Sequence, residues 1–455
     1  MQKTLRGEPD LLHGPVLENL LRFALPIMLG TLLQQLYSMV DAVVLGQFVG
    51  KEALAAVGGS ALAVINLLLN FFVGLTSGAA IVISQHYGAH EPDRVRQALH
   101  TSLLLAVGIG AVMTLLGILL APGFLRALET PEDTFQYSVD YMRWYFAGMI
   151  PCMIYNMGSS VLRAVGDSRR PLYFLMLCTA VNTVLDLFFV AVLRMEVAGA
   201  AIATSLSQVI CAVFVLRSLA RRTDACRLDW AQLHAEPATL RRMLLLGLPS
   251  GLQSILYNAT NLYTQKAVNL MGTDTVAAWS ICGKLDGLFW PISGAIGIAV
   301  MTFIGQNYGA RNLERVRAGV HAGLRLHLVT SALFAAVTVL LRKYAARLFA
   351  SDPEVLRQAE LFLLYMSSLY PLFSCVEVFS SAMRGVGNAM KPALLTLVTV
   401  SLLRMTLLFT VTFPHPSILT ISLCYPTTWI VSSAAFLLYY RFGRWMPQLP
   451  KEKPV

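Results

Sequence analysis

Residues 24–46 read ALPIMLGTLLQQLYSMVDAVVLG, a run whose single charged side chain is Asp41. A helix of about 20 apolar residues crosses a hydrocarbon core of roughly 30 Å. The 455-residue chain is 56% hydrophobic and 13% charged, with a mean hydropathy of +0.62, whereas soluble domains are roughly 25% charged. Helices and closed barrels satisfy their backbone groups without water, and the long apolar runs favour helices. The sequence therefore predicts an all-α membrane protein.

Hydrophobic runs predict twelve transmembrane helices, near residues 17–46, 54–84, 98–121, 134–157, 171–193, 197–217, 243–270, 277–306, 320–341, 357–382, 392–413 and 417–440. Connections after the even-numbered spans hold sixteen Lys and Arg residues against seven in the others. Because basic residues gather in cytoplasmic loops, both termini are expected in the cytoplasm. This distribution also accounts for the net charge of +10 and excludes a continuous nucleic-acid-binding face.

The two halves of the chain repeat at an offset of 221–223 residues. ALPIMLGTLLQQLYS (24–38) is similar to GLPSGLQSILYNATN (247–261), and the QxYGA motif occurs at 85–89 and 306–310. We expect an amino-terminal lobe (1–217), a cytoplasmic linker (218–242), a carboxy-terminal lobe (243–441) and a cytoplasmic tail (442–455). After six crossings the chain is back on the side of the membrane where it began, so both halves have the same orientation. The repeat therefore predicts two six-helix bundles related by a pseudo-two-fold along the membrane normal.

Asp41 is costly inside a span and so indicates function; the alternative is an aspartate near the helix end that reaches interfacial water. Gln34, Tyr37 and Asp41 share one face of the first helix. Asn182 and Asp186 are one turn apart on the fifth helix, and Thr204 lies at similar depth on the sixth. Two carboxylates in a poorly solvated pocket either take up a proton or bind a cation such as Na⁺.

The second half lacks these acids. Glu377 and Arg404 fall at similar depth on successive helices, which favours a buried ion pair over substrate contact. Tyr257 and Trp290 either line a substrate cavity or pack in the bilayer interface, and Lys284 is a further cavity candidate. The sequence contains no phosphate-binding GxxxxGK[ST] loop and no catalytic set such as HExxH, so we expect neither an enzyme nor a cofactor.

The quoted segments, together with LRAVGD before Pro171 and MRGVGN before Pro392, resemble the MATE (multidrug and toxic compound extrusion) transporters over nearly the whole chain. The acidic set is similar to the cation site of the DinF-like branch, which implies that Ala200 contributes its carbonyl and that Pro26 bends the first helix; a static kink at Pro26 is the alternative. NorM-like members carry acids where this chain has Tyr257 and Phe373, so no acidic role is carried over to the second half.

The resemblance implies a plasma-membrane antiporter that exports amphiphilic organic cations in exchange for Na⁺ or H⁺ by alternating access. Lys284 and Arg404 leave room for a zwitterionic or anionic substrate. A lipid-linked precursor flippase of the same superfamily is the alternative function. We expect a monomer in the lipid bilayer, with no nucleic-acid partner.

Overall fold

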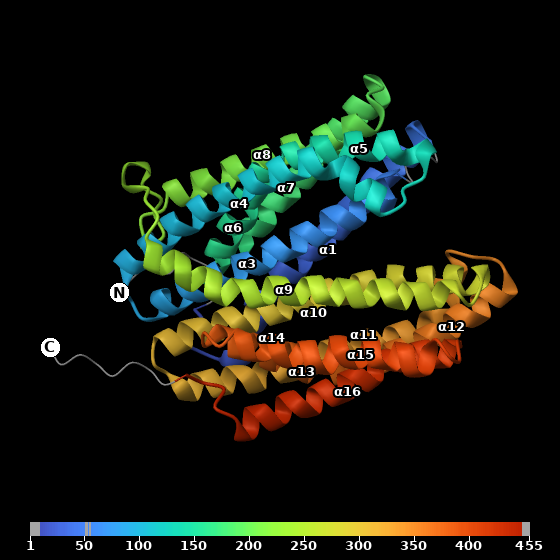
Figure 1. The fold of residues 1–455 in the computed structure, drawn as a ribbon. Helices are drawn as coiled ribbons and strands as arrows, with labels where there is room; N and C mark the ends of the chain where they lie inside the picture. Colours follow the sequence, from blue (N-terminus) through green and yellow to red (C-terminus); the bar gives the residue numbers. More distant parts are fainter. Residues whose placement is uncertain (1–9, 51–52, 54–55, 448–455) are drawn as a thin grey trace. The chain divides into compact units, whose positions relative to one another are not determined.

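The structure, a computed structural model, describes residues 10–50, 53 and 56–447, apart from the side chains of residues 37–39, 42 and 43. All regular secondary structure in these residues is helical (Figure 1). This confirms the all-α class.

The helices of the first half are α1 (Val16–Phe48), the π-helix η1 (Val57–Ala61), α3 (Leu62–Gly88), α4 (Pro92–Ala127), α5 (Glu132–Ala147), α6 (Met149–Ala164), α7 (Arg169–Asp186), the π-helix η2 (Leu187–Val192) and α8 (Glu196–Ala220). Those that follow are the 3₁₀ turn η3 (Trp230–Gln232), α9 (Pro237–Asn269), α10 (Thr273–Gly309), α11 (Leu313–Arg347), α12 (Pro353–Ser367), the 3₁₀ turn η4 (Tyr370–Phe373), α13 (Ser374–Gly385), α14 (Met390–Thr396), the π-helix η5 (Leu397–Leu402), α15 (Leu403–Leu407), the π-helix η6 (Leu408–Thr412) and α16 (Ile418–Phe442).

Each predicted span overlaps a helix or a run of helices, and ten of these runs in the described residues are long and apolar enough to cross a membrane. The span predicted at 134–157 is divided at Gly148 into α5 and α6, of 16 residues each. Side chains from other helices satisfy carbonyls near the end of α5: Thr114 donates to Phe146 O at 2.9 Å and Ser205 to Trp144 O at 2.8 Å. These bonds stabilise the break. The other span that is not among the ten is α9.

The repeated sequence motifs are signals that end helices. After each QxYGA segment one residue takes a left-handed backbone conformation, His90 at φ 57° and Arg311 at φ 58°. The glycines of the two AVGD and GVGN turns, Gly166 at φ 97° and Gly387 at φ 88°, do the same. Glycine adopts this conformation without the strain that a side chain adds. These motifs therefore fix the fold rather than the chemistry.

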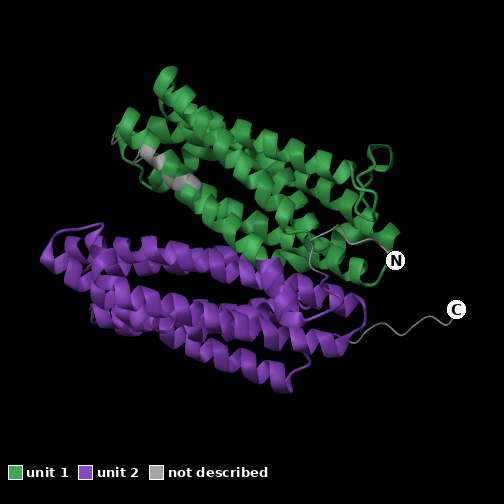
Figure 2. Cartoon of the chain, turned by 180° about the vertical axis from the view of Figure 1, so that it is seen from behind, with its two compact units in different colours: residues 1–8, 25–251 green, residues 9–24, 252–455 purple. Residues whose placement is uncertain are grey.

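The chain packs as two compact units (Figure 2). Among the described residues, unit 1 holds 25–251, and unit 2 holds 10–24 together with 252–447. The unit boundaries thus fall inside α1 and inside α9, one residue before Pro26 and two residues after Pro249. The predicted lobes (1–217 and 243–441) divide the sequence at the linker and stay a prediction, whereas the first turns of α9 pack with unit 1.

Within unit 1, α3 and α9 meet through two Gly-x-x-x-Gly segments, residues 74–78 and 247–251. A Cβ added to Gly78 would lie 2.1 Å from Met243 O, and one added to Gly74 would lie 2.6 Å from Gly251 Cα. Only glycine permits the backbones to approach this closely, as at other membrane-helix crossings. The four glycines therefore fix how closely α3 and α9 pack.

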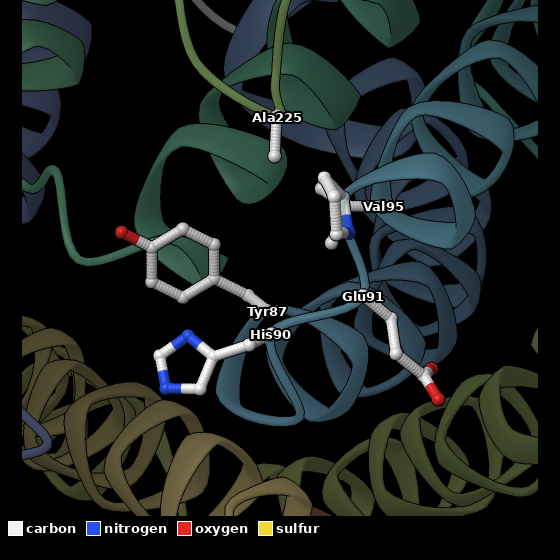
Figure 3. Close-up of a pocket in the computed structure, with 6 residues that line it drawn as sticks. Tyr87, His90, Glu91, Val95 and Ala225 are labelled. Carbon is white, nitrogen blue, oxygen red and sulfur yellow. The ribbon is translucent and has the colours of Figure 1, made fainter. Parts of the chain in front are cut away.

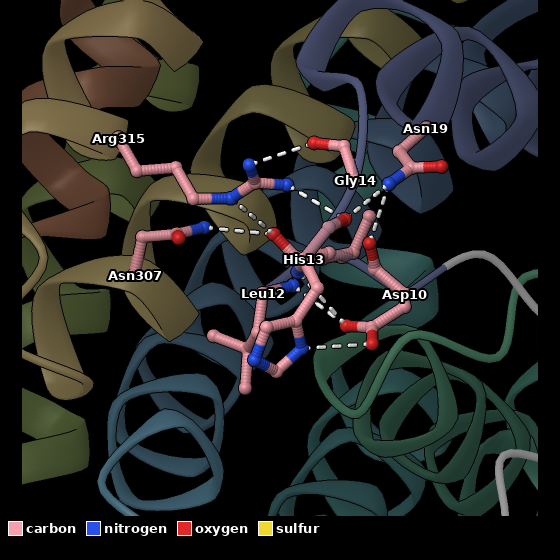
Figure 4. A network of polar contacts seen from close by, with 8 residues as sticks. Asp10, Leu12, His13, Gly14, Asn19, Asn307 and Arg315 are labelled. Carbon is pink, nitrogen blue, oxygen red and sulfur yellow. Dashed lines mark hydrogen bonds and ion pairs between the residues drawn. The ribbon is translucent and has the colours of Figure 1, made fainter.

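Residues 10–15, before α1, are held to unit 2 by side-chain bonds to backbone carbonyls (Figure 4). Arg315 of α11 donates to Leu11 O at 3.2 Å, His13 O at 2.9 Å and Gly14 O at 2.8 Å. Asn307 of α10 also donates to Leu11 O, at 3.1 Å. The segment thus has a fixed path, although its composition gives little sign of regular structure.

Candidate functional site

The acidic residues predicted on α1, α7 and α8 come together inside unit 1. Asp186 is the last residue of α7, directly before the π-helix η2. Asp186 and Asn182 are fully buried, and Thr204 of α8 is 6% exposed. A π-helical turn frequently marks a functional site in a helix. The polar cluster therefore lies where α7 departs from regular geometry.

Asn182 connects the two carboxyl groups. With its amide nitrogen toward them, it donates to Asp41 Oδ1 at 3.1 Å and to Asp186 Oδ2 at 2.9 Å, and its oxygen accepts from the backbone N–H of Thr204 at 3.3 Å. This orientation is assigned from the hydrogen-bond network, in which the opposite one would face oxygen toward oxygen. One amide thus joins α1, α7 and α8.

The arrangement leaves a buried carboxylate oxygen available to a cation. Within the described residues Asp186 Oδ1 has no hydrogen-bond partner, and the side chains of Asp41 and Asp186 interact with each other. Two carboxylates that share one amide in a poorly solvated site repel each other, so the pair is stable when a proton or a cation offsets one charge. Carboxylate, amide and hydroxyl oxygens are the ligands that hard cations prefer. The residues present therefore fit either H⁺ or Na⁺.

The cluster faces a cavity of about 330 Å³ within unit 1. Asp41, Thr204 and Gln34 line this cavity. The sequence interpretation missed several other polar lining residues, namely Asn66, Asn70, Tyr141, Tyr145, Tyr155 and Asn156. Tyr141 and Tyr145 lie one turn apart on α5, a spacing that could have indicated a shared face. The cavity thus combines an acidic end with aromatic and amide groups.

Three further residues of this half were predicted to take part in ion coupling or gating, namely Tyr37, Ala200 and Pro26. The side chain of Tyr37 lies outside the described residues. Ala200 is buried at 3% exposure near the start of α8. Pro26 lies inside the continuous helix α1, next to the unit boundary.

The cavity candidates of unit 2 lie in different surroundings. Trp290 packs against the rings of Phe373 at 5.1 Å and Trp429 at 6.0 Å. The Lys284 ammonium lies 4.7 Å from the centre of the Phe349 ring. Tyr257 of α9 lies 5.5 Å from the Arg404 guanidinium. Their contacts therefore do not define one shared pocket.

The predicted ion pair between Glu377 and Arg404 does not form. Glu377 accepts a hydrogen bond from Ser381 at 3.4 Å, and Arg384 donates to the same Ser381 hydroxyl at 3.1 Å. Arg404 instead contacts tyrosine rings and Thr428. Similar depth on successive helices did not bring the two side chains together, because Glu377 lies against the backbone of Gly297 on α10.

A second cavity, of about 150 Å³, lies beside the first QxYGA motif in unit 1 (Figure 3). Tyr87, Val95 and Ala225 line it, whereas the Glu91 carboxylate points away from Ala225. Glu91 is within 2.6 Å of His86 Nδ1. The Glu91 carboxylate is thus engaged in a local contact, and the acidic cluster of α1, α7 and α8 remains the candidate site.

These features define a class: an internally repeated, multi-pass helical membrane protein with an acidic cluster beside a cavity. A family model named MatE matches residues 26–188 and 249–410. The chain is similar to the probable multidrug resistance protein YpnP of Bacillus subtilis, with 30% identity over 96% of this chain and 97% of that protein. It is also similar to an FAD transporter of Shewanella oneidensis, with 24% identity over 89% of this chain and 90% of that protein.

Among solved structures, the outward-facing conformation of a multidrug resistance MATE family transporter of the MOP superfamily matches with a TM-score of 0.89 and 22% identity. The match covers 97% of this chain and 98% of that one, and it supports the fold. The chain belongs to the MatE family of transporters.

Proposed function

We propose that this protein is a secondary antiporter of the plasma membrane that exports amphiphilic organic cations in exchange for Na⁺ or H⁺. The observation that carries the proposal is the pair Asp41 and Asp186, joined by Asn182 at 3.1 and 2.9 Å, with Asp41 lining the cavity of unit 1. The names of relatives such as YpnP favour multidrug export. We place both termini in the cytoplasm, and we expect a monomer to be sufficient.

The coupling cation would supply positive charge to the two carboxylates, with Asp41, Asp186, Asn182, Thr204, the Ala200 carbonyl and Tyr37 as its candidate partners. Without that charge, repulsion between the carboxylates favours separating α1 from α7 at this point. With it, the Asn182 amide holds the two helices together. Pro26 removes one backbone hydrogen bond from α1, which makes it the natural bend point. The cavity then alternates in access as α1 changes its path.

The test is uptake of ethidium into inside-out vesicles under an imposed Na⁺ or H⁺ gradient. We expect gradient-driven uptake by the wild type, and at least about a tenfold loss in Asp41→Asn and Asp186→Asn, because each change removes a carboxylate from the coupling pair. Asp93→Asn is the matched control, since the Asp93 side chain is 95% exposed and should leave uptake unchanged.

Full gradient-driven uptake in both Asp41→Asn and Asp186→Asn would refute the role of this pair in ion coupling. The alternative function is a flippase for lipid-linked precursors. It would gain support if the wild type moved no ethidium but transferred a fluorescent polyprenyl-phosphate lipid between leaflets. The imposed gradient that drives uptake identifies the coupling ion.

A further inference from the structure

Unit 2 contains a buried positive charge with unsatisfied donors. Arg404 of α15 is fully buried, and its one hydrogen bond is from Nη2 to Thr428 Oγ1 at 3.4 Å. Its Nε and Nη1 have no partner in the described chain. A guanidinium carries five N–H donors and keeps its charge in proteins. Burying such a group without an acidic partner is costly, so the site is incomplete as it stands.

Two tyrosine rings surround this charge. The Tyr425 ring centre lies 4.0 Å and the Tyr257 ring centre 5.5 Å from the Arg404 guanidinium. Aromatic rings stabilise the charge through their faces but leave the in-plane N–H groups without acceptors. Either edge of a guanidinium can donate two parallel bonds to one carboxylate or phosphate. The missing partner is therefore a planar or tetrahedral oxyanion.

The two acidic side chains that could pair with Arg404, Asp286 of α10 and Glu377 of α13, are engaged elsewhere. Asp286 accepts a hydrogen bond from Tyr370, and Glu377 is bonded by Ser381. Neither residue forms an ion pair with Arg404 in the part of the chain that the structure describes. An acceptor for Arg404 must come from outside this set.

The local backbone is also irregular. Arg404 belongs to the five-residue α15, which lies between the π-helices η5 and η6. Single π-helical turns are rare and frequently mark functional sites. Two of them flank this one arginine, which is a second observation independent of its unsatisfied nitrogens.

The internal repeat relates this place to the acidic cluster of unit 1. At an offset of 221 residues, η2 (Leu187–Val192) corresponds to η6 (Leu408–Thr412), and Thr204 corresponds to Tyr425. The motif offset of 223 relates Gln34 to Tyr257. Equivalent elements thus carry two acids in unit 1 and one arginine in unit 2. The equivalent place in the second half of the sequence therefore carries the opposite charge.

We propose that Arg404 binds the anionic group, a carboxylate or phosphate, of a flat amphiphilic substrate, and that Tyr257 is the cover that moves aside to admit it. Tyr425 is buried at 7% exposure, whereas Tyr257 on α9 is partly exposed, so Tyr257 is the ring that a ligand meets first. This assignment rests on the proposed function and adds to it the substrate class: zwitterions with a separate acidic group, in addition to simple cations.

The test compares two dyes with the same fluorophore: an unsubstituted rhodamine as the free acid, a zwitterion, and its methyl ester, a cation. Fluorescence anisotropy measures their binding to purified protein in phosphatidylcholine nanodiscs. We expect Arg404→Gln to weaken binding of the free acid by about tenfold or more, the effect of losing charge-assisted bonds. Binding of the ester should stay within about twofold. Arg404→Lys should fall between the two, because it keeps the charge but not the paired donors.

Arg163→Gln is the matched control, because Arg163 on α6 of unit 1 also has a buried Nε without a partner; it should leave the binding of both dyes unchanged. Equal losses for the acid and the ester in Arg404→Gln would assign Arg404 a structural role and overturn the proposal. Equal wild-type affinity for the acid and the ester, unchanged by Arg404→Gln, would also overturn it.

A second arm identifies the source of the anion. Adding phosphatidylglycerol to the nanodiscs should leave free-acid binding unchanged; if the lipid abolishes it in the wild type but not in Arg404→Lys, the occupant is a lipid headgroup and the substrate assignment fails. Gradient-driven transport of the ester is measured with the same purified proteins reconstituted into phosphatidylcholine liposomes. Export of the ester without preferential binding of the acid would refute this inference and leave the proposed function intact.

Discussion

Asn182 lies one helical turn before Asp186 on α7, and its amide nitrogen is 2.9 Å from Asp186 Oδ2. The same nitrogen is 3.1 Å from an oxygen of Asp41 on α1. A single neutral side chain therefore joins two acidic groups from different helices. Its removal should affect ion binding more directly than removal of an uncharged residue that lines the cavity.

We expect Asn182→Leu to abolish stabilisation by the coupling ion. A ligand that binds only the folded state raises the free energy of unfolding by RT ln(1 + [L]/Kd), which is about 2.7 kcal/mol at a ligand concentration a hundredfold above Kd. Differential scanning fluorimetry with increasing Na⁺, or across a pH series, measures the shift in Tm. Asn156→Leu is the control, since Asn156 lines the same cavity but bonds to Cys152 O on its own helix. A full ion-dependent shift in Asn182→Leu would contradict the role given to the amide.

Gly78→Ala should destabilise the protein, whereas Gly108→Ala should not. A Cβ on Gly78 would lie 2.1 Å from Met243 O, but a Cβ on Gly108 meets nothing within 4 Å. Forcing the crossing of α3 and α9 apart should cost about 1–3 kcal/mol. Replacing an unobstructed helical glycine by alanine typically gains about 0.5–1 kcal/mol. Thermal unfolding in detergent measures both, and equal effects would show that α3 and α9 do not approach this closely.

Arg315→Ala should release residues 10–15 from unit 2. The change removes three hydrogen bonds to the carbonyls of Leu11, His13 and Gly14, and each bond to a charged donor contributes about 1.5–3 kcal/mol. Hydrogen exchange of the segment should rise by at least about tenfold. Arg317→Ala removes an exposed arginine of the same helix and serves as the control. Unchanged exchange in Arg315→Ala would show that the bond from Asn307 to Leu11 O and those from the Asn19 amide to Asp10 O and His13 O suffice to hold the segment.

The start of the linker between α8 and α9 should open in acid. Burial raises the pKa of Asp224, whereas the hydrogen bond and the positive charge of Arg222 lower it. Together with the other contacts of Asp224 the lowering prevails, so the pKa lies below the ordinary value of 3.8. A lowered folded-state pKa means that the contact contributes stability above pH 3.8 and loses it as the pH falls through the folded-state pKa. Arg222 also lies 3.4 Å from buried Asp167, which ties the linker to the α6–α7 turn.

Peptic cleavage of residues 221–229 during an acid titration measures this opening. Arg222→Gln should make the segment susceptible at higher pH than in the wild type, because Asp224 then lacks its cation. Arg221→Gln, at the exposed neighbouring position, should behave like the wild type. A titration that is identical in all three proteins would contradict the linkage.

Periodicity and length were sufficient to predict the helices, because a lipid-embedded backbone has few other solutions. The cluster of Asp41, Asn182 and Asp186 was predictable from spacing, since helical geometry relates residues three, four and seven apart. The contacts of Glu377 were not, because its partner depends on how α10 and α13 pack around Gly297. The break at Gly148 depends similarly on hydroxyl groups of α4 and α8, which lie far from it in the sequence.

The unit boundaries inside α1 and α9 bear on how such a chain could have arisen by duplication. Each half of the sequence contributes the beginning of its first helix to the packing unit formed mainly by the other half. Two separate copies of the ancestral half would therefore have exchanged these segments, as in a domain-swapped dimer. A chain cut within the linker should accordingly assemble from its two fragments when they are made together, whereas either fragment alone would lack part of its own core.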